Sequence, residues 1–134
     1  MPIAGGEPTQ VTHEGGTDAV SSSDGSTLIF YRDGEIRRIA ATGGPESTVT
    51  SGIMRGKWAV AGDKVYAIRA GSDRSIVVEM EMDGSREKTV YEAPVQLMDA
   101  SLVASLGVSA RTGEIFFQHQ ARLESDLMIV EGFR

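Results

Sequence analysis

The chain has 134 residues and a mass of 14.3 kDa, the size of a single domain. Its 40% hydrophobic and 24% charged residues exclude a disordered or fibrous protein, and the formal net charge of −6 argues against a nucleic-acid partner. Because the chain has no cysteine, a disulfide framework, a thiolate zinc site and a cysteine nucleophile are excluded. The compartment stays open between cytoplasm and periplasm.

Apolar runs such as Leu127–Val130 are far too short to cross a membrane. The start M-P-I-A-G-G lacks the basic segment and the apolar run of a signal peptide. We therefore expect this segment to make no membrane contact.

An internal repeat of about forty residues organises the chain. G-G-E-P-T-Q-V-T at Gly5–Thr12 recurs as G-G-P-E-S-T-V-T at Gly43–Thr50, and a weaker copy begins at Asp83. Repeats of this length are typical of solenoids and propellers.

Short β-branched or aromatic runs separated by Asp-Gly and Gly-Gly turns fill each repeat, a pattern that predicts antiparallel hairpins. Ahead of the first unit, Thr9–Thr12 has the sequence of a fourth strand. The first unit (18–50) should contain strands at Asp18–Ser21, Thr27–Tyr31, Ile36–Ile39 and Ser47–Thr50.

The second unit (57–91) repeats this order, and the third (107–130) contributes only three strands. In the second, the strands are expected at Lys57–Val60, Asp63–Ile68, Ile76–Met80 and Lys88–Tyr91. In the third, they are expected at Gly107–Ser109, Ile115–Gln120 and Leu127–Val130. We expect Thr9–Thr12 to supply the missing fourth strand of this closing unit, while Pro94–Leu106 forms either a short helix or an extended loop.

Three stretches resemble the TolB-type, WD40-like propeller repeat: S-S-S-D-G-S-T-L-I-F-Y, G-E-I-R-R-I-A-A-T-G-G and P-E-S-T-V-T. The C-terminal part is similar to the closing blade of propellers found in bacterial winged-helix transcriptional regulators and signalling kinases. The resemblance implies an all-β fold in which 1–134 is a single propeller segment of about three four-stranded blades. The usual Pro-Asp of the first turn is replaced here by Ser23-Asp24, Ala61-Gly62 and Arg111-Thr112.

Known propellers close with about four to eight blades, so three blades do not close a ring alone. The chain could be a fragment of a larger propeller, an open stack, or half of a six-bladed ring formed by two copies. We favour assembly, because uncovered terminal blades would expose apolar surface.

No catalytic, cofactor or metal site is expected. His13-Glu14 lacks the second histidine of a zinc-binding helix, and His119 is expected to be a packing or hydrogen-bonding residue. Aspartates beside turns should bond their own backbone, and the pairs Gly5-Gly6, Gly15-Gly16 and Gly43-Gly44 should be turn glycines. These aspartates are Asp24, Asp33, Asp63, Asp73, Asp83 and Asp126.

The basic cluster of Arg32, Arg37 and Arg38 is interleaved with Asp33 and Glu35, which predicts a solvated strand face. Trp58, the only tryptophan, should pack between blades.

We therefore expect a non-catalytic scaffold that binds a protein or peptide partner and belongs to a larger bacterial regulator. The alternatives are an accessory propeller of a peptidase or other hydrolase, and a half-propeller that only self-assembles. Loops around Arg55, Arg74 and Arg122 could contact a ligand.

Overall fold

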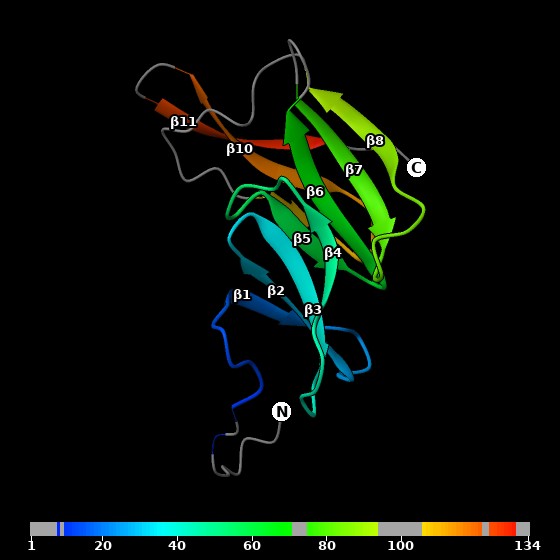
Figure 1. Ribbon diagram of the computed structural model, residues 1–134. Helices are drawn as coiled ribbons and strands as arrows, with labels where there is room; N and C mark the ends of the chain where they lie inside the picture. The colour runs from blue at the N-terminus through cyan, green and yellow to red at the C-terminus, as the bar shows by residue number, and fades with distance from the viewer. Residues whose placement is uncertain (1–7, 9, 71–74, 94–105, 122–123, 131–134) are drawn as a thin grey trace.

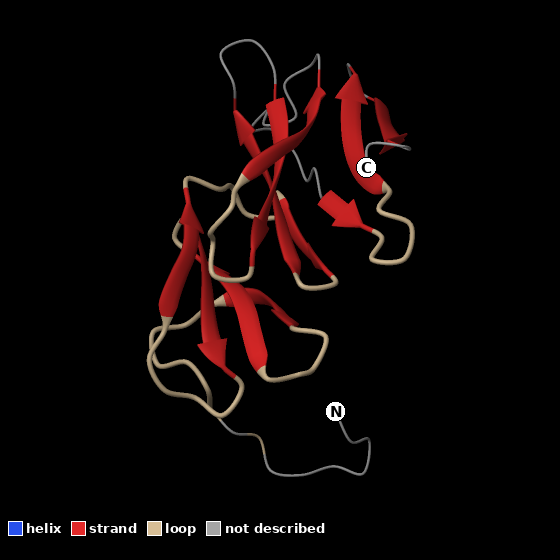
Figure 2. Cartoon of the chain, turned by 90° about the vertical axis from the view of Figure 1, so that its right-hand side faces the viewer, coloured by secondary structure: helices blue, strands red, loops and turns tan. Residues whose placement is uncertain are grey.

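The computed structural model describes residues 8, 10–70, 75–93, 106–121 and 124–130. This part of the chain forms eleven β-strands in three antiparallel sheets and contains no helix (Figures 1 and 2). It follows that no helix in these residues could cross a membrane.

Each of the first two sheets has four strands in sequence order, joined by tight turns. The first contains β1 (Thr17–Ser21), β2 (Thr27–Arg32), β3 (Glu35–Ala40) and β4 (Ser47–Ser51). The second contains β5 (Trp58–Ala61), β6 (Lys64–Ala70), β7 (Ser75–Glu81) and β8 (Lys88–Ala93).

The third sheet has three strands, in the order β11-β10-β9. These are β9 (Leu106–Val108), β10 (Ile115–Ala121) and β11 (Glu124–Val130). All eleven strands overlap the ranges expected from the sequence, and the expectation of an all-β fold is confirmed.

The repeat is visible in the strand pairing as well as in the sequence. Where β3 pairs with β4, the register shifts at Ile36/Arg37 and leaves Val49 as the bulged residue. Where β7 pairs with β8, the shift at Val77/Val78 leaves Val90 in the same role. The bulge therefore recurs at an equivalent place in both sheets, with a valine at each.

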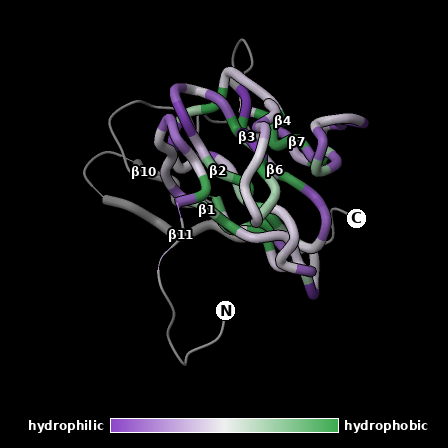
Figure 3. The backbone as a smooth tube through the Cα atoms, turned by 60° about the horizontal axis from the view of Figure 1, so that its bottom comes forward, coloured by the Kyte–Doolittle hydropathy of each residue, from purple (hydrophilic) through white to green (hydrophobic). Residues whose placement is uncertain are grey.

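The first and second sheets stack face to face. Alternate residues of the second sheet point to opposite sides, and those on one side pack against the first sheet. Val65 and Val78 join a cluster with Ile29 and Ile36 of the first sheet, and Trp58 lies in the same cluster with 6% of its surface exposed. The prediction that Trp58 is a packing residue is confirmed, and the two elements that it packs between are the first and second sheets. Figure 3 shows hydrophobic residues, in green, along strands such as β2 and β6.

The opposite face of the second sheet packs against the third. Tyr66, Ile68 and Val77 form a second cluster with Leu106 and Ile115. The second sheet is thus sandwiched, and the first and third sheets lie on its two sides (Figure 2).

The turn sequence Asp-Gly-Ser occurs twice and folds the same way each time. Asp24 Oδ1 accepts hydrogen bonds from the Ser26 amide at 2.9 Å and its hydroxyl at 2.7 Å. Asp83 Oδ1 does the same with Ser85, at 2.9 and 2.5 Å. The prediction that turn aspartates bond their own backbone is confirmed at these two positions.

One strand expected from the sequence does not form. Residues 10–12 lie outside every sheet, although Thr9–Thr12 was expected to be a strand; residue 9 itself lies outside the described residues. A strand needs a paired neighbour to satisfy its backbone groups, and no described strand pairs with residues 10–12. Of the range 94–106, only Leu106 is described, and it begins β9.

Candidate interaction surfaces

The first sheet has one face turned away from the rest of the stack, which we call the outer face. Ile29 and Ile36 point into the cluster shared with the second sheet, so their strand neighbours point outward. Phe30 and Ile39 are each only 2% exposed yet belong to neither cluster between sheets. The outer face comprises Leu28, Phe30, Arg32, Glu35, Arg37, Ile39, Glu46 and Thr48.

Arginines and glutamates are paired across this face. Arg32 donates two hydrogen bonds to the Glu46 carboxylate, at 2.7 and 3.0 Å, and its guanidinium lies 5.3 Å from the Phe30 ring centroid. Arg37 bonds Glu46 at 3.0 Å and Glu35 at 2.6 Å. The prediction of a solvated face is wrong for Arg32 and Arg37, whose side chains are 14% and 20% exposed, because Glu46, directly before β4, holds both.

These pairs make the stability of the protein depend on pH. The hydrogen bond from Arg32 lowers the pKa of Glu46 from 4.5 to about 2. A carboxyl with a depressed pKa in the folded state stabilises the fold above its unfolded pKa, and this contribution is lost as the pH falls through the folded value. We expect the melting temperature of Glu46→Gln to fall less than that of the wild type between pH 5 and 2. An equal fall in both proteins would contradict this assignment.

A second bidentate pair repeats this arrangement in the second sheet. Arg69 donates to Glu87 at 3.1 and 2.8 Å, as Arg32 does to Glu46, and each glutamate directly precedes the fourth strand of its sheet. Arg69 also reaches the preceding sheet, where it donates to the Ser51 carbonyl at 3.0 Å and the Thr50 hydroxyl at 2.5 Å. Arg69 therefore clamps two sheets together.

We expect Arg69→Ala to reduce the free energy of unfolding by about 1–2 kcal/mol, since it removes a charged group's hydrogen bonds at a partly exposed site. Urea denaturation followed by fluorescence measures the change. Arg55→Ala is the matched control: that side chain is 67% exposed and pairs with Asp18, which is also exposed, so its loss should cost less than about 0.5 kcal/mol. Equal effects of the two substitutions would argue against the clamp.

The N-terminal segment lies on the outer face. Val11 and Thr12 line a small cavity of about 210 Å³ together with Leu28, Phe30 and neighbouring residues. Arg32 donates to the Gly15 carbonyl at 2.6 Å, a contact that parallels the bond from Arg69 to the Ser51 carbonyl. The segment therefore meets the first sheet much as the end of β4 meets the second.

The outer face differs from its counterpart on the second sheet in polarity. Pairing with β2 and β6 places Arg37 and Glu35 of the first sheet where the second has Val78 and Ile76. The Glu46 network neutralises much of this charge within the sheet. Within the described residues, Arg32 Nε is nevertheless buried without a hydrogen-bond partner.

Among the described residues, the third sheet has an open edge in the position that the other two sheets fill. Their order is completed by β4 and β8, which pair with the third strands β3 and β7. In the third sheet, β11 occupies the third position, and no described segment pairs with its other side. The backbone groups along that edge can receive another strand.

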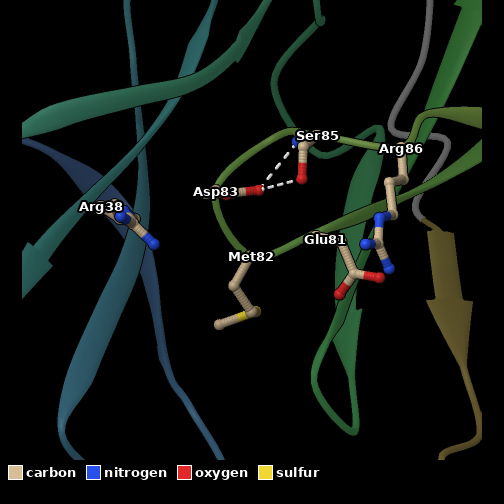
Figure 4. A pocket seen from close by; sticks show the side chains of 6 residues that line it. All are labelled: Arg38, Glu81, Met82, Asp83, Ser85 and Arg86. Carbon is tan, nitrogen blue, oxygen red and sulfur yellow. Dashed lines mark hydrogen bonds between the residues drawn. The ribbon is translucent and has the colours of Figure 1, made fainter.

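An open cleft of about 430 Å³ separates β3 from the turn between β7 and β8 (Figure 4). Arg38 faces the turn, and its Nε donates to Ser47 at 3.1 Å. Both carboxylates of the cleft already have partners: Glu81 pairs with Lys64, and the bonds from Ser85 lower the pKa of Asp83. The lining residues are Arg38, Glu81, Met82, Asp83, Ser85 and Arg86.

The other residues singled out in the sequence do not converge on one place. Arg55 pairs with Asp18, His13 is exposed, and Asp63 accepts a bond from Ser23 at 2.9 Å. Arg74, Arg122 and Asp73 lie outside the described residues, as do the side chains of His119 and Asp126. The described glycine pairs, Gly15-Gly16 and Gly43-Gly44, adopt positive φ in the segments before β1 and β4, and the Gly43 amide donates to the Ala40 carbonyl at 2.8 Å.

In the described ranges, no group of three or more acidic or histidine side chains is placed to hold a metal ion. The pairing of Arg32 with Glu46 was not predicted from the sequence. The pair Arg69 and Glu87 repeats it in the second sheet, and this repetition could have indicated the pairing. No protein-family model matches the chain, and no curated protein matches it either.

Proposed function

We propose that the chain is a non-catalytic β-propeller segment of the TolB type that serves as a protein-interaction scaffold. Its three sheets would be neighbouring blades, and the partner would be a protein or peptide that adds a strand to the third sheet. Three features support the blades: the repeat of about forty residues, the four-strand order of the first two sheets, and the apolar packing of successive sheets.

The observation that carries the binding role is the open edge of β11. An exposed sheet edge binds an extended peptide through main-chain hydrogen bonds, while side-chain positions along the strand provide specificity. The first two sheets contain the strand that this position accepts, in β4 and β8. The third sheet offers the same position to a partner.

The chemistry of the partner strand follows from β4 and β8. Both carry Thr-Val with the valine as the bulged residue, Thr48-Val49 in one and Thr89-Val90 in the other. Val49 is 7% exposed and belongs to the cluster between sheets, so the bulge directs this side chain inward. We expect a partner strand with a Thr-Val or similar β-branched pair at this place.

A fluorescent peptide copying residues 86–93, R-E-K-T-V-Y-E-A, tests the proposal by anisotropy and hydrogen exchange on the Thr12→Pro chain, in which the N-terminal segment of another copy fits poorly at the same edge. Saturable binding should slow amide exchange in residues 124–130 and leave the already paired β7 unchanged. The matched control is the same peptide with Thr89→Pro, because Thr89 of β8 pairs with Val78 and proline fits poorly at a paired position. Binding of both peptides alike, or no change in exchange along 124–130 at saturation, would overturn the proposal.

A further inference from the structure

We infer that the partner strand is residues 10–12 of a second copy of this chain, so that two copies complete each other's third sheet. The inference rests on the proposed function, since it names the occupant of the same edge. It makes the N-terminal segment of one chain the fourth strand of the other chain's third sheet.

Sequence is the first reason. Residues 5–12 repeat residues 43–50 at an offset of 38, and this alignment sets Val11 on Val49, the bulged valine of β4. The N-terminal segment therefore carries a fourth-strand sequence, Thr-Gln-Val-Thr, and its described residues 10–12 belong to no sheet.

Position is the second reason. Val49 belongs to the same cluster as Val65 and Ala67 of the second sheet. The residues paired equivalently in the first sheet are Leu28 and Phe30, and these line the small cavity with Val11. The segment thus lies where the fourth strand of a preceding sheet would lie, and only the rest of that sheet is lacking.

A second copy is the occupant that fits both ends. In one chain the second sheet lies between the first sheet, which holds residues 10–12, and the third sheet, which has the open edge (Figure 2). Within one chain, residues 10–12 and the open edge of the third sheet therefore lie on opposite sides of the second sheet and do not meet. A two-fold arrangement satisfies both edges at once and stacks six sheets, within the range of about four to eight blades in closed propellers.

The residues that pair in turn across the strands of a sheet predict the register of this contact. Trp58 pairs with Ala67, Ala67 with Val78, and Val78 with Thr89 in the second sheet. The matching row of the third sheet runs from Leu106 through Phe117 to Met128, because Leu106, like Trp58, begins the first strand of its sheet and is buried. Thr89 corresponds to Thr48, and Thr48 to Gln10, so Gln10 should lie opposite Met128. One step along, Thr12 should lie opposite Leu127.

Engineered disulfides test this register, because the chain has no cysteine of its own. Gln10→Cys and Met128→Cys chains are mixed in equal amounts and oxidised gently, and covalent dimers are measured on a non-reducing gel. Held partners should link at least about ten-fold faster than partners that meet by collision. The matched control mixes Gln10→Cys with Val20→Cys, since Val20 is 40% exposed on β1 and reports collisions.

Fluorescence of Trp58 checks that each variant is folded, and the pair Thr12→Cys with Leu127→Cys repeats the test if Met128→Cys fails to fold. Cross-linking above the control supports the second copy. Cross-linking at the control rate in a folded pair overturns it. In that case, binding of the 86–93 peptide would show that the open edge still takes another partner, whereas failure of both experiments would reject the proposed function as well.

Discussion

Replacing Gly84 by alanine is expected to reduce the free energy of unfolding by about 3 kcal/mol, one of the largest effects of any small substitution in this chain. Gly84 lies in the turn between β7 and β8, where its φ is +88°. A Cβ there would come within 1.9 Å of the Val49 carbonyl oxygen, which belongs to β4 of the neighbouring sheet. The clash is with backbone, so relief would require the two sheets to move apart.

Gly25→Ala is the matched control. Gly25 stands in the same Asp-Gly-Ser turn sequence with a φ of +75°, but no atom lies within 4 Å of its Cβ position. The control therefore carries only the conformational cost, about 1–2 kcal/mol for an L-residue in this region. Chemical denaturation of both variants measures the difference, and equal losses would show that the β7–β8 turn does not press on the first sheet.

Ile36→Ala is expected to cost about 3 kcal/mol, because the removed methyl and methylene groups leave a cavity between two sheets. Ile36 is 0% exposed and shares its cluster with Val78 and Trp58 of the second sheet. Since Trp58 is the only tryptophan, its fluorescence reports on the second sheet while the substitution is in the first. We expect the fluorescence and far-ultraviolet circular dichroism transitions to shift together to lower urea concentration.

Val20→Ala provides the comparison for Ile36. Val20 is 40% exposed, so the loss of its methyl groups should change the free energy of unfolding by less than about 0.5 kcal/mol. If Ile36→Ala instead left the Trp58 transition in place while circular dichroism shifted, the first two sheets would unfold independently and the shared core would be contradicted.

The strands were predictable because their signals are local. β-branched runs such as Thr27–Tyr31 alternate with turns whose Asp-Gly pairs favour positive φ, and each hairpin joins neighbours in sequence. The packing of Trp58 was also accessible, since a lone large aromatic in a short strand has few places to be buried.

The ion network on the outer face was harder to predict because it depends on register. Arg32 and Glu46 are fourteen residues apart and meet only once β2, β3 and β4 are aligned. Read along the chain, Arg32 and Arg37 appear beside Asp33 and Glu35, which suggests solvated charges. The glutamate that orders both arginines is separated from them by a turn.

The N-terminal segment shows the opposite limit. Residues 10–12 have the composition of a strand, and the internal repeat aligns them with β4. Formation of β-structure, however, depends on neighbouring strands more than on intrinsic preference. The described part of one chain offers no such neighbour, so the segment lies against Leu28 and Phe30 without joining a sheet.

Light scattering on the purified wild-type chain, across a dilution series, tests the assembly of two copies most directly. The account predicts a mass of twice 14.3 kDa that persists on dilution, because each copy supplies the strand that the other's third sheet lacks. A mass of 14.3 kDa at every concentration would contradict it.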